Sequence, residues 1–146
     1  MRRVIRPLRL AALGAAAIVA GGCAKSAGPP AIPPDALCVR CSMEASSARF
    51  ACEWHSGKEW KIYDSIECLM RDCGPTAPTS LWLPDYDQRA LHRADSLWIV
   101  KGDLNTPMGG GLVAVVDRAS AEAVAASSHG RVGRWGDFSG KPEAAK

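Results

Sequence analysis

The sequence predicts an α+β fold in which two ββαβ units pack into one small domain. Two observations lead to this prediction. Each half of the chain runs from two strand-like segments into a helical pattern and then into a short apolar segment. The dipeptides Tyr63-Asp64 and Val116-Asp117 also recur at the same point of the two halves, where a strand ends and an acidic residue begins a helix.

The first unit begins with a predicted β-hairpin. Side chains alternate over residues 48–54, so that Cys52 and Trp54 share one face of the strand and Glu53 lies on the other. A turn at 55–58 and a second alternating segment at 59–63 complete the hairpin.

A helix over residues 64–73 follows the hairpin. Asp64 is the predicted N-cap, with Glu67 three places on as in a capping box. The helical spacing of its apolar residues makes Met70 a core residue, and Gly74-Pro75 ends the helix. Residues 81–83 are the last strand of this unit.

The second unit repeats this order. Strands are expected over 97–101 and 112–116, a helix over 119–128 and a last strand over 132–135. The loop at 102–111 is rich in glycine and therefore flexible by composition. It carries Met108, for which two roles stay open, a metal ligand or an apolar plug against the core.

The chain divides into four parts. Residues 1–22 have the arginines and apolar run of a secretory signal, and they lead into Val-Ala-Gly-Gly-Cys23, similar to a bacterial lipobox. Cys23 is therefore expected to carry the lipid (palmitate), and residues 23–37 to be a Pro-rich tether. Residues 38–138 form the folded domain, and 139–146 a flexible tail.

The net charge excludes a nucleic-acid-binding role. The chain has 18 Lys and Arg against 15 Asp and Glu. Four of the arginines lie in the predicted signal, so the remainder carries a net charge of −1. No basic stripe remains to bind phosphates.

The segment Cys38-Val39-Arg40-Cys41-Ser42-Met43 carries the clearest chemistry. Two thiols and a thioether within six residues are soft ligands, which select Cu(I) over harder ions. Zinc sites use Cys, His and carboxylate, so Met43 favours copper. The alternatives are a plain disulfide between Cys38 and Cys41, or an unligated Met43 packed in the core.

The other cysteines and the histidines are expected to be structural or solvated. Without Cys23 an odd number of cysteines remains, which leaves at least one free thiol. Three of them are assigned to structure, and three histidines to the surface or a helix end: Cys52, Cys68 and Cys73, and His55, His92 and His129.

Taken together, the motifs resemble the NosL family of accessory lipoproteins, which are copper chaperones for nitrous oxide reductase. The resemblance covers residues 38–138. It is carried by Cys-x-x-Cys-x-Met and by four further segments in the same order, Tyr63-Asp64-Ser65-Ile66, Leu97-Trp98-Ile99-Val100, Pro107-Met108-Gly109 and His129-Gly130-Arg131-Val132. It implies a fold similar to part of organomercurial lyase.

The resemblance also implies a Cu(I) site. Cys41 would be the thiolate anchor, Met43 and Met108 neutral thioether ligands, and Cys38 an additional member. Many relatives have Gly where this chain has Ser42, and Gly where it has Arg131. Neither position is a ligand in the family pattern.

The expected function is therefore non-enzymatic. A lipid-anchored periplasmic chaperone would deliver Cu(I) to nitrous oxide reductase or to its membrane assembly machinery. Ala24 after the lipidated cysteine favours the outer membrane, and the number of ions and chains per site stays open. The alternative is a periplasmic thiol–disulfide oxidoreductase using Cys38 and Cys41. A carbon–mercury lyase would rest on fold likeness alone, and haem attachment would need His in place of Ser42.

Overall fold

The computed structural model describes residues 28–74 and 78–140 of the 146-residue chain. The predicted signal peptide, Cys23 and the last six residues of the predicted tail lie outside these ranges. Within them, no helix has the length and apolar character needed to cross a membrane.

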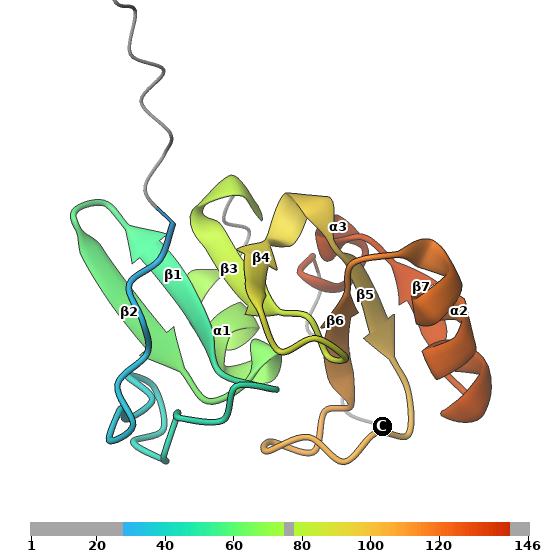
Figure 1. Cartoon of the computed structure of the whole chain (residues 1–146), viewed down its shortest axis with the longest axis horizontal. Coiled ribbons are helices and arrows are strands. Elements are labelled where there is room, and N and C mark those ends of the chain that lie inside the picture. Colours follow the sequence, from blue (N-terminus) through green and yellow to red (C-terminus); the bar gives the residue numbers. More distant parts are fainter. Residues whose placement is uncertain (1–27, 75–77, 141–146) are drawn as a thin grey trace, which may run out of the picture.

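The first unit forms a four-stranded antiparallel sheet (Figure 1). Its elements in chain order are β1 (Cys52–Ser56), β2 (Glu59–Tyr63), α1 (Ile66–Cys73), η1 (Pro78–Ser80), β3 (Leu81–Pro84), β4 (Leu91–Arg93) and η2 (Ala94–Ser96). The strand order is β2-β1-β3-β4. The edge strand β4 and the two 3-10 turns were not predicted from the sequence.

The second unit forms a three-stranded sheet of order β6-β5-β7. Its elements are β5 (Trp98–Lys101), β6 (Leu112–Val115), α2 (Arg118–Ser127), β7 (Arg131–Gly133) and α3 (Trp135–Phe138). In both units the first strand is central and lies between the second strand and the strand that follows the helix. The predicted α+β fold of two ββαβ units is confirmed, with β4 and α3 as additions.

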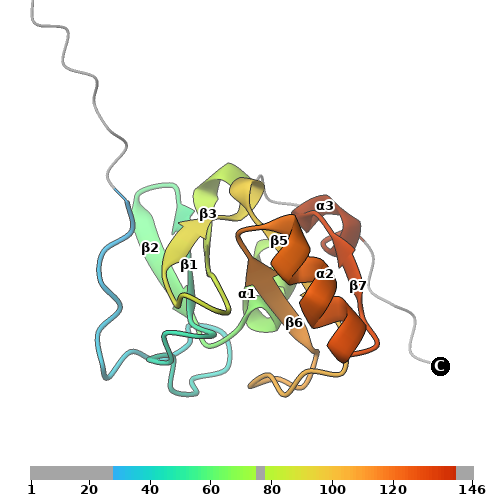
Figure 2. The ribbon, with the colours of Figure 1, turned by 45° about the vertical axis from the view of Figure 1, so that its right-hand side comes forward.

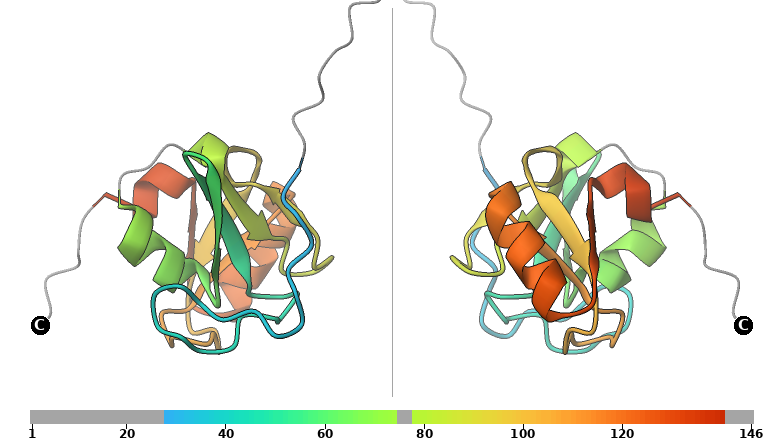
Figure 3. Two further views of the ribbon diagram at one scale, coloured as in Figure 1. Left: turned by 90° about the vertical axis from the view of Figure 1, so that its left-hand side faces the viewer. Right: turned by 90° about the vertical axis from the view of Figure 1, so that its right-hand side faces the viewer.

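One core joins the two units. Its buried residues come from both sheets and from α1, and include Cys52, Tyr63, Leu69, Leu83 and Ile99. A second, smaller cluster lies between α2 and the other face of the second sheet. Helices α1 and α2 therefore lie on opposite sides of the strands, as Figures 2 and 3 show.

The cap of α1 differs from the prediction by one residue. Ser65, not Asp64, is the N-cap, and its hydroxyl accepts a hydrogen bond from the Cys68 backbone N–H at 3.3 Å. Asp117 caps α2 as predicted, accepting from the Ser120 N–H at 2.8 Å. The shift frees the Asp64 carboxylate for a different contact.

Glu53 lies on the face of β1 opposite to Cys52 and Trp54, as the alternation predicts. The Glu53 side chain is nevertheless fully buried, because β1 is central and this second face is also covered. Glu53 is paired with Trp82 of β3, and Gly28 approaches the Trp82 ring. Part of the predicted tether thus packs on the first sheet, where Gly28 to Ile32 line a groove with Trp82 and Leu91.

Candidate metal centre

The Cys-x-x-Cys segment forms a tight loop before β1. The Cys38 N–H donates to the Met43 carbonyl, and the Ser42 N–H donates to the Cys38 carbonyl, both at 2.8 Å. Ser42 takes up the left-handed conformation that this turn requires, with φ of 61°. The Val39 N–H donates to the Ile62 carbonyl at 3.0 Å and fastens the loop to β2.

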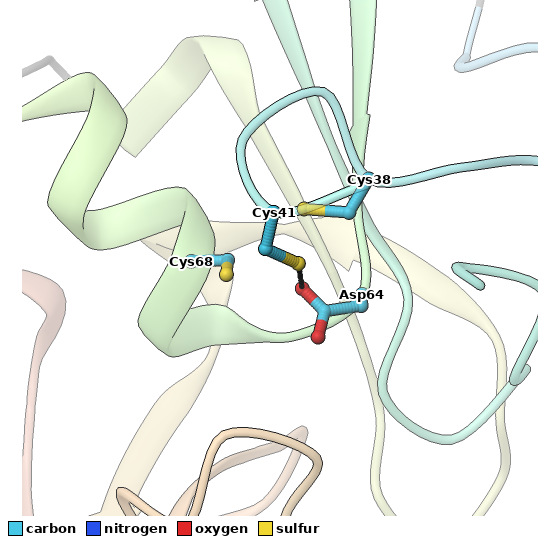
Figure 4. Close-up of side chains that lie close together, drawn as sticks. All are labelled: Cys38, Cys41, Asp64 and Cys68. Atoms are coloured by element: carbon cyan, nitrogen blue, oxygen red, sulfur yellow. Dashed lines mark hydrogen bonds between the residues drawn. The ribbon is translucent and has the colours of Figure 1, made fainter. Parts of the chain in front are cut away.

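This loop brings two thiols to a third thiol and a carboxylate. The ligand atoms of Cys38, Cys41, Asp64 and Cys68 all lie within 4.8 Å of one another (Figure 4). We call this group the thiol cluster. Asp64 follows β2 directly, and Cys68 lies in the first turn of α1. Three separate pieces of the fold therefore converge on one position.

Burial differs among the members of the thiol cluster. Cys38, Asp64 and Cys68 are buried, whereas Cys41 is partly exposed. The Cys41 thiol donates to Asp64 Oδ1 at 3.6 Å, and the buried Asp64 Oδ2 has no hydrogen-bond partner. The group thus offers three sulfur atoms and an unsatisfied oxygen around one point, with Cys41 on the open side.

Burial keeps two of the thiols protonated in the absence of a metal. It raises the pKa of Cys38, although backbone N–H groups of Cys41, Asp64 and Arg40 act in the opposite direction. Burial also raises the pKa of Cys68 strongly, and the neighbouring Asp64 and Cys41 raise it further. Because a thiol binds metal as thiolate, binding must displace these protons.

The structure places the two predicted thioether ligands differently. Met43 follows the Cys-x-x-Cys loop and is 49% exposed. Met108 lies in the β5–β6 loop, half-buried against the core cluster that contains Cys38 and Cys68. The β5–β6 loop and the cysteine loop lie at the same end of the molecule (Figures 1 and 3). The ligand roles of both methionines stay predictions.

The β5–β6 loop is held to α1, although its composition predicted flexibility. Glu67 Oε1 accepts from the Thr106 hydroxyl at 2.6 Å and from the Leu112 N–H at 3.1 Å. Thr106 Oγ1 in turn accepts from the Gly111 N–H at 3.0 Å. Gly110 is needed here, because a Cβ at this position would lie 2.4 Å from Glu67 Cγ. Glu67 therefore links the Met108 loop to the helix that carries Cys68.

Two members of the thiol cluster were missed from the sequence. Asp64 was assigned to the helix cap and Cys68 to the core. The sequence holds one indication, because Ser65 is as good an N-cap as Asp64. A helix that begins one residue later leaves Asp64 outside it and puts Cys68 in its first turn.

The remaining cysteines and histidines lie outside the thiol cluster. Cys52 and Cys73 are buried, as expected of structural cysteines. His55 stacks on Trp60 with ring centroids 4.7 Å apart, and His129 lies on the surface with Nδ1 3.4 Å from Asp103. His92 is partly buried at the edge of the first sheet. Among the described residues, no histidine joins the group.

Comparison with known proteins supports the fold. No protein-family model matches the chain, and no curated protein matches it. Among solved structures, the chain is similar to the copper chaperone NosL from Shewanella denitrificans, with a TM-score of 0.66 and 17% sequence identity. The match covers 77% of this chain and 96% of the other. At this identity the likeness shows the fold alone.

Proposed function

We propose that this chain is a Cu(I) chaperone that delivers copper for the assembly of nitrous oxide reductase and performs no catalysis itself. The observation that carries the proposal is the thiol cluster, in which three sulfur atoms and a carboxylate lie within 4.8 Å of one another. It occurs on a fold similar to that of a copper chaperone.

The donor atoms suit Cu(I). Thiolate and thioether are soft ligands, which Cu(I) prefers and Mg²⁺ or Ca²⁺ do not. We assign Cys41 as the anchor, Met43 and Met108 as thioether ligands and Cys38 as an additional thiolate. Backbone N–H groups directed at Cys38 favour its thiolate, which a bound cation would favour further.

Exposure around the site suits transfer to a partner protein. Among the described residues, the exposed large apolar side chains are Leu37 (60%), Val39 (56%), Met43 (49%) and Val116 (37%). Leu37 and Val39 are adjacent to Cys38 in sequence, and Met43 is two residues after Cys41. An apolar surface beside a metal site favours docking of the protein that accepts the ion. Cys41 and Met43 are then the side chains within reach of incoming ligands.

The cellular setting follows from the first residues of the sequence. We propose that Cys23 carries a lipid and anchors the chain at the periplasmic face of a bacterial membrane, with the outer membrane favoured. The tether up to residue 27 would then connect the lipid to the first sheet, against which Gly28 packs.

The thiol–disulfide oxidoreductase alternative is less favoured. A nucleophilic cysteine has a lowered pKa and an accessible sulfur. Cys38 is buried, and burial raises its pKa. An insulin-reduction assay with turnover dependent on Cys38 would support that alternative against ours.

Delivery is tested by mixing the Cu(I)-loaded chain with copper-free nitrous oxide reductase under anaerobic conditions, with and without its membrane assembly machinery. We expect copper to be retained by the reductase after the two proteins are separated. A double variant, Leu37→Ser with Val39→Ser, should bind Cu(I) normally and transfer it more slowly. Absence of transfer from a fully loaded wild-type chain, with the machinery present, would contradict the delivery proposal.

A further inference from the structure

Cys68 has a position that the proposed ligand set does not explain. Its side chain projects from the first turn of α1 toward Cys41 and Asp64 (Figure 4). Its sulfur lies within 4.8 Å of the ligand atoms of Cys38, Cys41 and Asp64. Cys73, on the same helix and also buried, is not part of this group. Packing in the core therefore accounts for Cys73 but leaves the convergence at Cys68 unexplained.

The spacing of the three sulfur atoms fits a single soft ion. With metal–sulfur bonds of about 2.3 Å, three sulfur atoms around one ion lie about 4 Å from one another. The observed upper limit of 4.8 Å requires only small side-chain movements to reach that spacing.

Resting on the proposed copper function, we infer that Cys68 is a third thiolate ligand, and that the resting Cu(I) ion is held between Cys38, Cys41 and Cys68. Two of these residues are buried in the domain. The thioethers of Met43 and Met108 add weaker bonds to the same ion, so they contribute to its affinity. They also replace a thiolate when the ion leaves the site.

Binding of one Cu(I) ion by the three thiols exchanges protons for the metal. Three S–H bonds break, three Cu–S bonds form, and three protons leave to solvent, while copper stays Cu(I) and no sulfur is oxidised. The negative charge that remains is offset locally in two ways. Backbone N–H groups of Arg40, Cys41 and Asp64 are directed at Cys38. Cys68 lies at the positive end of α1, where an anion is stabilised.

The test uses reduced residues 24–146, which contain every described element, under anaerobic conditions. Cu(I) affinity is measured by competition with a chromophoric chelator, and thiolate coordination by the Cu(I)–thiolate charge-transfer absorbance. The variants are Cys68→Ser and Cys68→Ala, with Cys73→Ser as the matched control on the same helix. Thermal unfolding of each apo-variant confirms that it folds. Protons released per ion at pH 6.5 are counted for the wild type, a measurement that needs no variant.

We expect both Cys68 variants to bind Cu(I) at least tenfold more weakly and to lose about a third of the charge-transfer absorbance. Cys73→Ser should match the wild type, and the wild type should release three protons per ion. Folded Cys68 variants with wild-type affinity and absorbance would overturn the inference, as would release of two protons or fewer. If the wild type binds no more tightly than a small thiol, the copper function itself fails, and this is seen without any variant.

Discussion

The Cys41 thiol donates a hydrogen bond to Asp64 Oδ1 across a sulfur–oxygen distance of 3.6 Å. The two residues are 23 positions apart and come from a loop and a strand end. Cys41 is the partly exposed member of the thiol cluster, so this contact orients the sulfur that an incoming ion meets first.

Removal of the Asp64 carboxylate should weaken metal binding. Groups that hydrogen-bond to a metal ligand orient it, and their loss commonly lowers metal affinity by about 10- to 100-fold. We expect Asp64→Ala to weaken Cu(I) binding by about tenfold. The measurement is anaerobic competition titration, with Asp87→Ala as control, because Asp87 is exposed and lies outside the thiol cluster. Equal affinity of the Asp64 variant and the wild type would show that Asp64 has no such role.

Glu67 should control the mobility of the β5–β6 loop. Glu67→Ala removes the acceptor for the Thr106 hydroxyl and the Leu112 N–H, both buried. Because buried donors are left unsatisfied, we expect the free energy of unfolding to fall by about 2 kcal/mol. Backbone amides of residues 106–111 should exchange hydrogen faster. Thr106→Val tests the same connection from the loop side and should speed exchange in the same segment.

The Glu67 variant also separates the two roles of Met108. If Met108 is a ligand, a mobile loop weakens Cu(I) binding in Glu67→Ala. Unchanged affinity alongside faster exchange would instead assign Met108 to packing against the core.

Replacement of Ser42 by glycine should stabilise the domain. Ser42 has φ of 61°, a conformation that costs a residue with a Cβ roughly 1 kcal/mol. We expect Ser42→Gly to raise the free energy of unfolding by about 0.5 to 1 kcal/mol, measured by urea denaturation. Ser139, with φ of −83°, gives the control, since Ser139→Gly relieves no strain. A Ser42→Gly variant less stable than the wild type would refute the strain argument.

Glu53 should make stability fall as the pH rises. Burial raises the pKa of Glu53 from 4.5 to about 7, and both its carboxylate oxygens lack a hydrogen-bond partner. The folded state therefore keeps the proton at pH values where the unfolded state has lost it. Stability from this group is fully present below pH 4.5 and is lost as the pH rises to about 7.

The size of this effect can be measured against a neutral variant. A shift of this extent corresponds to a loss on the order of 3 kcal/mol between the two limits. We expect Glu53→Gln to be more stable than the wild type at pH 8, and to lack the decline between pH 5 and 7. Parallel stability profiles of the two proteins would contradict the buried-carboxylate account.

The order of elements was predictable because it depends on local patterns. The alternation over 59–63 and the helical spacing up to Cys73 can be recognised from neighbouring residues alone. The predicted limits of the strand and the predicted end of the helix agree with the structure. The second helix was predicted within one residue at each end. The strand β4 and the burial of Glu53 depend on how the sheet is covered, which no local pattern records.

The candidate site was predictable only in part for the same reason. Cys38 and Cys41 are close in sequence, so their spacing alone indicated a site. Asp64 and Cys68 reach them through the docking of the cysteine loop on β2 and through the start of α1 at Ser65. The first depends on a tertiary contact, the hydrogen bond from the Val39 N–H to the Ile62 carbonyl. The second depends on whether Asp64 or Ser65 caps α1, a difference of one residue.

Anaerobic Cu(I) competition titration of reduced residues 24–146 tests the central claim most directly. The wild type is measured beside Met43→Ala and Met108→Ala, with Met70→Ala as control, because Met70 lies on α1 against the core. We predict tight binding of one ion per chain, weakened in Met43→Ala and Met108→Ala and unchanged in Met70→Ala. Binding by the wild type no tighter than that of a small thiol would contradict the assignment of a copper chaperone.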